Sequence, residues 1–169
     1  MANGKVLVVM GSDSDFPVME GCFKMLNKFG VEFEADVASA HRTPDRAHEL
    51  AATAEEKGFK VIIAAAGLAA HLAGVLAANT TLPVIGVPCK GGALNGVDAL
   101  YATVQMPTGI PVATVAIDGG SNAAILATQI IALSDDDVAS KLLDYKKELA
   151  SSVDTKETKL QEKLKEAGL

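Results

Sequence analysis

The sequence contains no tryptophan, and aromatic residues make up only 4% of its 169 residues. Its hydrophobic content is nevertheless 49%, so its core must consist mainly of aliphatic side chains. Aliphatic cores are typical of parallel sheets that are covered by helices on both faces. A chain of this length can bury one sizeable core, and we expect residues 1–169 to form a single domain.

Positively charged residues are also few. The 15 lysines and arginines are outnumbered by 21 acidic residues, which gives a formal net charge of -6, and no segment concentrates the basic residues. This balance argues against nucleic acid or an anionic membrane surface as the main partner. An anionic ligand would therefore have to be bound in a local pocket.

Cysteine is scarce too, and Cys22 and Cys89 match no metal-ligand spacing. We expect both to be buried free thiols, as in a reducing cytoplasm, and we expect no metal. The apolar run 61–78 is long enough to suggest a membrane span, but it divides at Gly67 into a strand-like and a helix-like half. Residues 6–10 are too few for the apolar part of a signal peptide, so we predict a cytoplasmic protein with no membrane partner.

Strand and helix signals alternate along most of the chain. Apolar runs predict five strands, at 5–10, 31–38, 61–65, 82–87 and 111–117. Helical signals predict a tight turn and an Ala-rich helix over 67–78, and further helices at 16–29, 44–57, 97–104 and 122–133. This alternation predicts an α/β fold, with a three-layer, doubly wound parallel sheet of the flavodoxin-like or Rossmann-like type over about residues 5–133.

An appended C-terminal helix is expected over about residues 135–169. Three successive aspartates at its start suit a helix N-terminus, whose dipole favours negative charge. Its apolar residues fall on one helical face, with a weak point at residues 151–152: Val138, Leu142, Tyr145, Leu149, Leu160 and Leu164. Such a stripe must be buried, either on its own domain or on a partner subunit.

Chemically active side chains concentrate in the segment 37–44, which reads Val-Ala-Ser-Ala-His-Arg-Thr-Pro. The imidazole of His41 can exchange a proton near neutral pH, while the guanidinium of Arg42 beside hydroxyls suits a phosphate. Ligands of an open parallel sheet bind at the carboxyl ends of its strands, where the loops 11–15, 39–44 and 66–72 should converge. We interpret the segment as the catalytic and anchoring element of a small-molecule enzyme.

The loop 11–15 lacks both the G-x-G-x-x-G and the P-loop patterns, so a dinucleotide or triphosphate site is not expected. A single phosphate is feasible, because amides at a helix N-terminus and the hydroxyls of Ser12 and Ser14 can bind one. The same residues could instead only cap the helix. Asp15 could accept hydrogen bonds from sugar hydroxyls, whereas Asp13 could be a capping residue.

The three histidines differ in their setting. His48 lies inside a predicted helix and is most simply a surface or packing residue. His71 lies in an apolar segment, where a histidine of the core is the usual occupant. His41 lies on a loop at the ligand-binding edge, and we assign it a function. No cluster has metal-ligand spacing, and the chain shows neither a nucleophile elbow nor a Schiff-base lysine.

Four motifs, in order along the chain, resemble the bacterial PurE family of purine biosynthesis. They are Gly11-Ser12-Asp13-Ser14-Asp15, Ser39-Ala40-His41-Arg42-Thr43-Pro44, the segment 66–72, and Val104-Gln105-Met106-Pro107. The resemblance runs from about Lys5 to Leu133. Arg42, Pro44 and the segment 69–72 are similar to class I members, the N5-carboxyaminoimidazole ribonucleotide mutases. Class II members, which carboxylate aminoimidazole ribonucleotide with carbon dioxide directly, usually differ at these places.

The resemblance implies an isomerase that moves a carboxylate from the exocyclic nitrogen to ring carbon C4 of an imidazole ribonucleotide. Carbon dioxide would be released and recaptured inside a closed pocket, without a metal, ATP or organic cofactor. His41 would be the general acid and base, Arg42 and Ser12 would bind the phosphate, and Asp15 the ribose. The surrounding pocket would include Ser39, Gly67, Ala70 and His71. The resemblance also implies a homo-octamer, which would give the C-terminal helix its partner.

This chain departs from the family pattern at several positions. Leu68 and Ala73 replace residues that are often Gly and Pro, and Ala99 and Ala102 replace common serines. The segment 90–92, Lys-Gly-Gly, is also unusual. These changes bear on the geometry of the lid and on affinity more than on the type of reaction.

Two alternatives stay open at this point. A class II aminoimidazole ribonucleotide carboxylase would differ only in taking free carbon dioxide. A non-catalytic nucleotide-phosphate sensor of flavodoxin-like shape would need Arg42 and the serines, but it would not need His41 as a proton carrier.

Overall fold

The computed structural model describes residues 4–169, and these contain a parallel sheet of five strands. The strands are β1 (Lys5–Met10), β2 (Glu32–Val37), β3 (Phe59–Gly67), β4 (Val84–Cys89) and β5 (Ala113–Thr114). Their order in the sheet is β2-β1-β3-β4-β5, so the direction of winding reverses between β1 and β3. This order is that of doubly wound, flavodoxin-like sheets, and it confirms the expected fold class.

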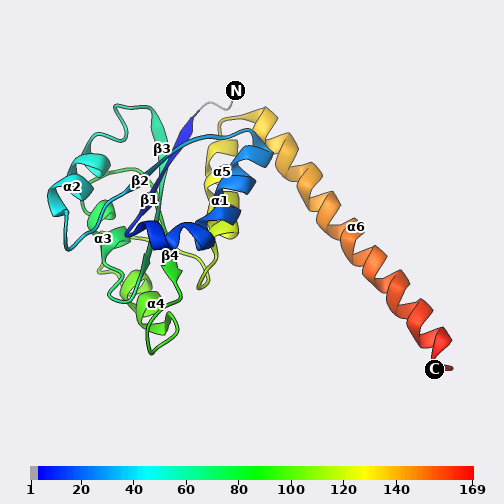
Figure 1. The fold of residues 1–169 in the computed structure, drawn as a ribbon. Helices are drawn as coiled ribbons and strands as arrows, with labels where there is room; N and C mark the ends of the chain where they lie inside the picture. The colour runs from blue at the N-terminus through cyan, green and yellow to red at the C-terminus, as the bar shows by residue number, and fades with distance from the viewer. Residues whose placement is uncertain (1–3) are drawn as a thin grey trace.

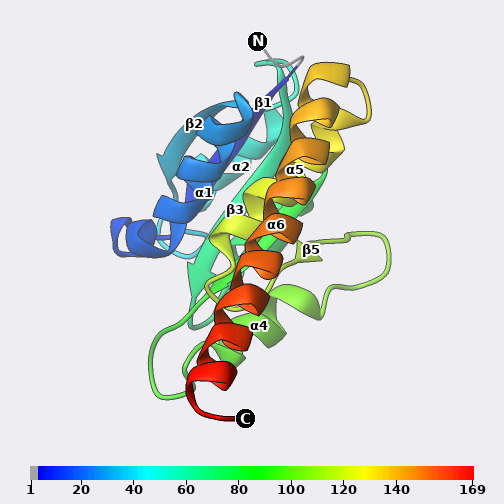
Figure 2. The same cartoon turned by 90° about the vertical axis from the view of Figure 1, so that its right-hand side faces the viewer.

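Helices cover both faces of the sheet (Figure 1 and Figure 2). On one face lie α1 (Phe16–Phe29), which follows the short 3₁₀ helix η1 (Asp13–Asp15), and α5 (Gly120–Ala132). On the other face lie α2 (Pro44–Ala52), α3 (Leu72–Ala77) and α4 (Val97–Val104). The three layers leave the carboxyl ends of the parallel strands together at one edge.

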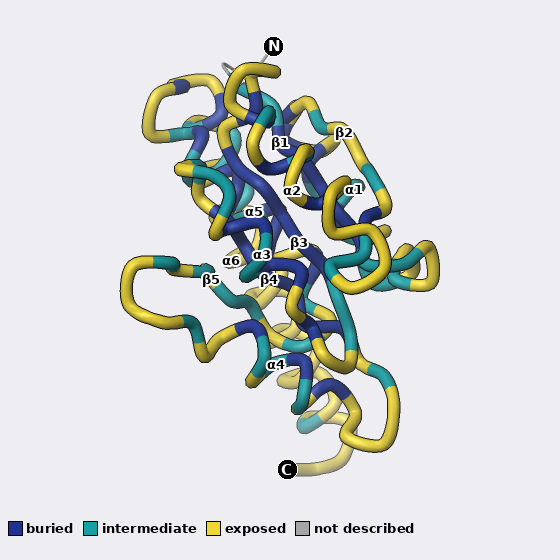
Figure 3. The backbone as a smooth tube through the Cα atoms, turned by 90° about the vertical axis from the view of Figure 1, so that its left-hand side faces the viewer, coloured by how far each residue is buried: buried dark blue, intermediate teal, exposed yellow. Residues whose placement is uncertain are grey.

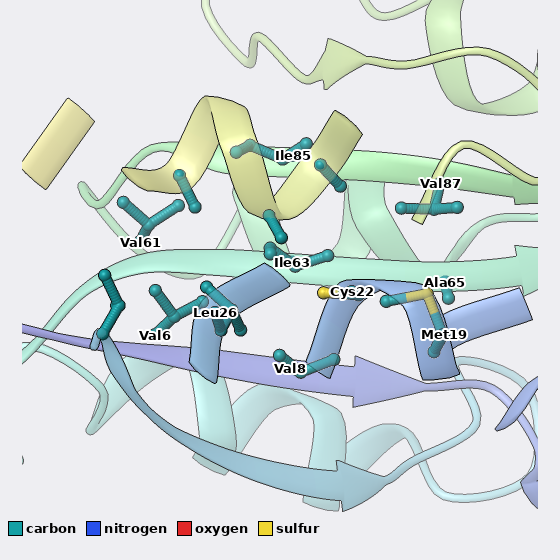
Figure 4. Packing of buried hydrophobic residues seen from close by; sticks show 14 of the residues in the cluster. Val6, Val8, Met19, Cys22, Leu26, Val61, Ile63, Ala65, Ile85 and Val87 are labelled. Carbon is teal, nitrogen blue, oxygen red and sulfur yellow. The ribbon is translucent and has the colours of Figure 1, made fainter. Parts of the chain in front are cut away.

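The strands divide their side chains between the two layers of helices. In β1, Val6 and Val8 point to one layer, whereas Leu7 and Val9 point to the other. Figure 3 shows that the strands β1, β3 and β4 are largely buried. Figure 4 shows the packing under α1, which includes Val6, Val8, Met19, Cys22 and Leu26. Burying one aliphatic side chain stabilises the fold by roughly 1.5–3 kcal/mol, so this packing fixes the ends of the central strands.

The edge strand β5 is shorter than the sequence predicts. A strand is expected over 111–117, but pairing with β4 is confined to Ala113–Thr114. The cause lies in β4, which includes Pro88. The carbonyl of Pro88 accepts a hydrogen bond from the Asp118 N–H at 2.9 Å, but proline has no N–H with which to continue the ladder.

Two helices are also shorter than predicted. The helix expected over 44–57 ends at Ala52, where the Thr53 hydroxyl donates to the Glu49 carbonyl at 2.8 Å and the following residues form turns. The run 61–78 divides into β3, a loop and α3, as predicted, although α3 begins only at Leu72. No helix within residues 4–169 combines the length and the apolar character needed to cross a membrane.

The C-terminal helix α6 (Asp136–Glu166) is continuous through residues 151–152, where the sequence predicts a weak point. Its first turns pack on the helices α1 and α5. Val138 is buried, and the Tyr145 ring lies edge-on to Phe29 of α1, with 5.4 Å between the centroids. Beyond these contacts the helix projects away from the sheet (Figure 1). Its later apolar side chains are exposed, namely Leu149, Val153 and Leu160.

Candidate active site

Loops at the carboxyl edge of the sheet surround a pocket of about 730 Å³. They follow β1, β2, β3 and β4, so the pocket lies where the strand order reverses. Backbone hydrogen bonds tie the loops to the neighbouring strands: the Gly11 N–H donates to the Ala65 carbonyl at 2.9 Å, and the Ala38 N–H to the Met10 carbonyl at 3.0 Å. Open α/β sheets bind small molecules at this position, and the volume suits one.

Ser12 caps the helix η1 in the loop after β1. Its hydroxyl accepts a hydrogen bond from the Ser14 N–H at 3.3 Å, and the Asp15 carboxylate accepts one from the Ser12 N–H at 3.0 Å. This reciprocal arrangement is a capping box, so the capping role considered for this loop is confirmed. Burial raises the pKa of the Asp15 carboxyl above its ordinary value, the Ser12 N–H opposes this shift, and the charge of Asp13 adds to it. Both Ser12 and Asp15 line the pocket.

The loop after β2 is a closed turn that presents Arg42. The Thr43 N–H donates to the Ser39 carbonyl, and the Ser39 N–H donates to the Thr43 hydroxyl, both at 2.9 Å. The Arg42 guanidinium lies 3.4 Å from both the Ser39 hydroxyl and the Gly11 carbonyl, so it bridges two loops. Among residues 4–169, no carboxylate lies within ion-pair distance of this guanidinium. An exposed guanidinium in such a position can bind an anion such as phosphate.

His41 and His71 form a hydrogen-bonded pair at the pocket. Nε2 of His41 lies 2.9 Å from Nδ1 of His71, and the two ring planes are inclined by 69°. One of these nitrogens must carry the shared proton and the other must accept it, so the tautomers of the two rings are linked. This geometry suits a step in which a single proton is carried.

His71 is not the core histidine that its apolar neighbours predict. It is exposed at the residue before α3, because the loop after β3 turns sharply. In this turn the Ala70 N–H donates to the Leu68 carbonyl at 2.9 Å, and the His71 N–H to the Ala69 carbonyl at 2.8 Å. Leu68 has a φ of 56°, in the left-handed region, which costs a residue other than glycine roughly 1–2 kcal/mol. The turn buries Ala70 and brings His71 to the pocket.

The loop after β4 also borders the pocket, through Cys89, Lys90, Gly91 and Gly92. Only the loops after the first three strands are expected at the site from the sequence, although the same strand-end rule applied to β4 finds this loop. Burial raises the pKa of the Cys89 thiol to about 12, and the charges of Asp15 and Asp118 add to the shift. Cys89 and Cys22 are both buried and free, as predicted.

The pocket lining includes seven of the eight residues that the sequence proposes for the site: Ser12, Asp15, Ser39, His41, Arg42, Gly67 and His71. The exception is Ala70, which is 1% exposed and lies outside the lining. His48 also lies outside, where its Nδ1 is 2.7 Å from the Asn79 Oδ1. Among residues 4–169, no group of three or more His, Cys, Asp or Glu side chains is arranged to hold a metal ion.

The motif at residues 104–107 lies outside the pocket lining. Its Met106 packs instead on α3: a Cβ added to Gly74 would lie 3.1 Å from the Met106 Sδ. Because His71 directly precedes α3, this contact helps to fix the position of the His71 ring.

The fold and the pocket define an open α/β protein with a small-molecule site at its strand switch point. The chain belongs to the AIR carboxylase family, whose model matches residues 5–152. The matched region therefore includes the first half of α6 and stops before its exposed end.

The relatives carry two enzyme names. The chain is 58% identical over 145 residues to the N5-carboxyaminoimidazole ribonucleotide mutase of Pyrococcus abyssi, which covers 86% of this chain and 83% of that protein. It is 51% identical over 154 residues to the phosphoribosylaminoimidazole carboxylase of Candida glabrata, which covers 91% of this chain and 27% of that protein. The solved structure of Treponema denticola PurE matches with a TM-score of 0.83 and 28% identity, over 93% of this chain and 98% of that chain.

Proposed function

We propose that the chain is an N5-carboxyaminoimidazole ribonucleotide mutase, an isomerase of purine biosynthesis. The observation that carries the proposal is its 58% identity, over most of its length, to an enzyme named as such a mutase. The pocket supports it with a hydrogen-bonded histidine pair and an exposed guanidinium, the two groups that proton transfer and phosphate binding require.

The polar groups of the pocket divide into anchoring and reacting groups. Arg42 and Ser12 bind the substrate phosphate, and the Asp15 carboxylate accepts hydrogen bonds from the ribose. Ser39, Gly67 and His71 complete the pocket, with Ala70 behind them. By the family resemblance, the reaction needs no ATP, metal or organic cofactor.

The reaction redistributes one carboxylate and one proton. His41, as an imidazolium, donates its proton to the exocyclic nitrogen as the bond from nitrogen to the carboxyl carbon breaks and carbon dioxide forms. The electron-rich C4 then bonds to carbon dioxide, and the neutral His41 removes the proton from C4. The imidazolium is thereby restored. His71 supports the cycle because it shares a hydrogen bond with the ring that carries the proton.

Turnover of the purified full chain tests the proposal. N5-carboxyaminoimidazole ribonucleotide is compared with aminoimidazole ribonucleotide plus bicarbonate, without ATP or metal. Product that forms from the first substrate faster than its spontaneous decay allows establishes the mutase. Product from the second pair alone indicates a direct carboxylase, and binding without turnover of either indicates a nucleotide-phosphate sensor.

The proposal extends to the assembly, which we take to be a cytoplasmic homo-oligomer, and an octamer by family resemblance. It is supported by the part of α6 from Leu149 onward, where Leu149, Val153 and Leu160 are 43%, 60% and 50% exposed. An amphipathic helix normally buries its apolar stripe, so a neighbouring subunit is a suitable partner for it.

A further inference from the structure

Lys90 gives the pocket a second positively charged side chain. Among residues 4–169, the lysine and arginine side chains that line the pocket are those of Arg42 and Lys90, against one carboxylate, that of Asp15. Lys90 is exposed, and no carboxylate of the described residues lies within ion-pair distance of its ammonium group. Its charge is therefore available to an anionic ligand.

The backbone of Lys90 is held in place by its surroundings. The Lys90 N–H donates a hydrogen bond to the Asp118 carboxylate at 2.7 Å. A Cβ added to Gly96 would lie 3.1 Å from the Lys90 Cα, and one added to Gly92 would lie 2.6 Å from the Leu68 Cδ2. The loop after β4 is thus closely packed, so a ligand that binds Lys90 has to order only its side chain, which limits the entropy cost.

Arg42 and Lys90 approach the pocket from opposite sides. Arg42 follows β2 and Lys90 follows β4, with β1 and β3 between these two strands. Because neighbouring strands lie about 4.8 Å apart, the ends of β2 and β4 are separated by roughly 14 Å. The Arg42 guanidinium reaches over the end of β1, where it lies 3.4 Å from the Gly11 carbonyl. The two cations therefore suit a ligand that has one anionic group at each end.

We propose that Lys90 is a specificity-determining residue that binds the carboxylate of the ribonucleotide while Arg42 binds its phosphate. This inference rests on the proposed mutase function, whose substrate and product both carry a carboxylate. The ion pair makes the chain prefer these two ligands over the decarboxylated aminoimidazole ribonucleotide. Lys90 belongs to the segment 90–92 that departs from the family pattern, so the preference is a property of this chain, and the chemical step does not depend on it.

The test compares two ribonucleotides that differ in one charge. The product has a carboxylate at C4, and its 4-carboxamide analogue has a neutral group of nearly the same shape at that position. Calorimetric titration of the purified full chain gives the dissociation constant of each. The wild-type protein should prefer the carboxylate, and Lys90→Gln should reduce this preference about fivefold, the effect of one exposed ion pair. Added salt should reduce the preference of the wild type more than that of Lys90→Gln.

Matched variants separate the charge of Lys90 from other effects of substitution. Lys90→Arg keeps a positive charge at the pocket and should retain the preference for the carboxylate. Lys57→Gln removes an exposed lysine that also has no ion pair but lies outside the pocket lining, and it should behave as the wild type does. All three substitutions are at exposed positions, so the melting temperatures should equal that of the wild type.

The outcomes distinguish this inference from the proposed function, because turnover of N5-carboxyaminoimidazole ribonucleotide by the wild type is measured in parallel. If Lys90→Gln weakens binding of the carboxylate and the carboxamide equally, Lys90 does not read the carboxylate and the inference is overturned. It is also overturned if the wild type binds both ligands equally well. In either case, wild-type turnover leaves the mutase standing. A wild-type protein that binds neither ligand and gives no turnover overturns the mutase function and this inference with it.

Discussion

His41 and His71 come from loops after different strands, yet Nε2 of the first lies 2.9 Å from Nδ1 of the second. The loop after β2 presents His41 directly. His71 reaches the same place because the loop after β3 turns at Leu68 and postpones the start of α3. The contact links the tautomers of the two rings, because one nitrogen must donate the shared proton and the other must accept it.

We predict that His41→Asn abolishes most turnover while leaving ribonucleotide binding nearly intact. Positioning and proton transfer are separate contributions, and the second is worth ~10²–10⁴ in rate. Steady-state kinetics give the loss in kcat, and calorimetric titration with a non-reacting ribonucleotide gives the affinity. An unchanged kcat would remove His41 from the mechanism.

Two further histidine variants serve as comparisons for that experiment. His48→Asn changes an exposed histidine outside the pocket and should leave kcat unchanged. His71→Asn should lower kcat less than His41→Asn does and should alter the pH dependence of kcat, because it removes the partner ring and not the acid itself. An identical pH profile in His71→Asn would show that the hydrogen bond has no part in the proton step.

Arg42→Ala should weaken ribonucleotide binding. A charge-assisted hydrogen bond is worth about 1.5–3 kcal/mol, which corresponds to a dissociation constant raised roughly 10- to 150-fold. The control is Arg46→Ala, because Arg46 pairs with Asp36 and lies outside the pocket lining. If the wild-type protein binds phosphorylated and dephosphorylated ligand equally well, Arg42 is not a phosphate anchor.

The parts of the fold that could be predicted are those whose signals are local. Gly30 ends α1 with a φ of 71°, as its position after the apolar periodicity indicates, and Pro44 begins α2. The short β5 could not be predicted in the same way, since its length depends on Pro88 in the neighbouring strand. A local pattern does not contain that information.

The residues of the candidate site also fall into those with local signals and those whose position depends on the tertiary fold. Ser39 and Thr43 form hydrogen bonds with each other across a closed turn, so the role of the segment 37–44 could be proposed from residues close together in the sequence. The contact between Leu68 and Gly92 and the inclusion of Lys90 depend on where β3 and β4 end in space. The core position expected for His71 is wrong for the same reason, because only the tertiary turn exposes it.

Asp15→Asn should stabilise the protein at neutral pH while impairing substrate binding. Burial raises the pKa of Asp15 in the folded protein, so the folded state binds more protons than the unfolded state between the two pKa values. Stability of the wild-type protein therefore falls as pH rises through that window, which begins near the ordinary value of about 3.9. The asparagine oxygen can still accept the hydrogen bond from the Ser12 N–H.

Thermal melts of both proteins between pH 4 and 8 test the direction of the Asp15 pKa shift. The melting temperature of Asp15→Asn minus that of the wild type should be positive at neutral pH and should shrink toward acid. A difference that is constant with pH, or that grows toward acid, would contradict the direction assigned to the Asp15 shift.

Neither cysteine should react in the native protein. Burial raises the pKa of both Cys22 and Cys89 to about 12, so at pH 8 only about one thiol in 10⁴ is ionised, and both side chains are covered. Treatment with iodoacetamide followed by mass spectrometry should find no adduct until denaturant is added. Rapid modification of Cys89 in the folded protein would show that the pocket admits the reagent to a reactive thiolate.

The exposed half of α6 should be an interface between copies of this chain. Light scattering of the purified full chain should give a mass several times that of the 17.4 kDa subunit. The double variant Val153→Lys with Leu160→Lys places two charges in the apolar stripe, so it should reduce that mass.

A matched double variant, Ser151→Lys with Thr158→Lys, adds the same charge to the opposite face of α6 and should leave the mass unchanged. The comparison separates an interface through the apolar stripe from general charge repulsion, which would affect both variants equally. A wild-type protein that is monomeric at micromolar concentration would refute the oligomer. Equal dissociation by both variants would remove the stripe as its cause, and the exposed leucines of α6 would then need another explanation.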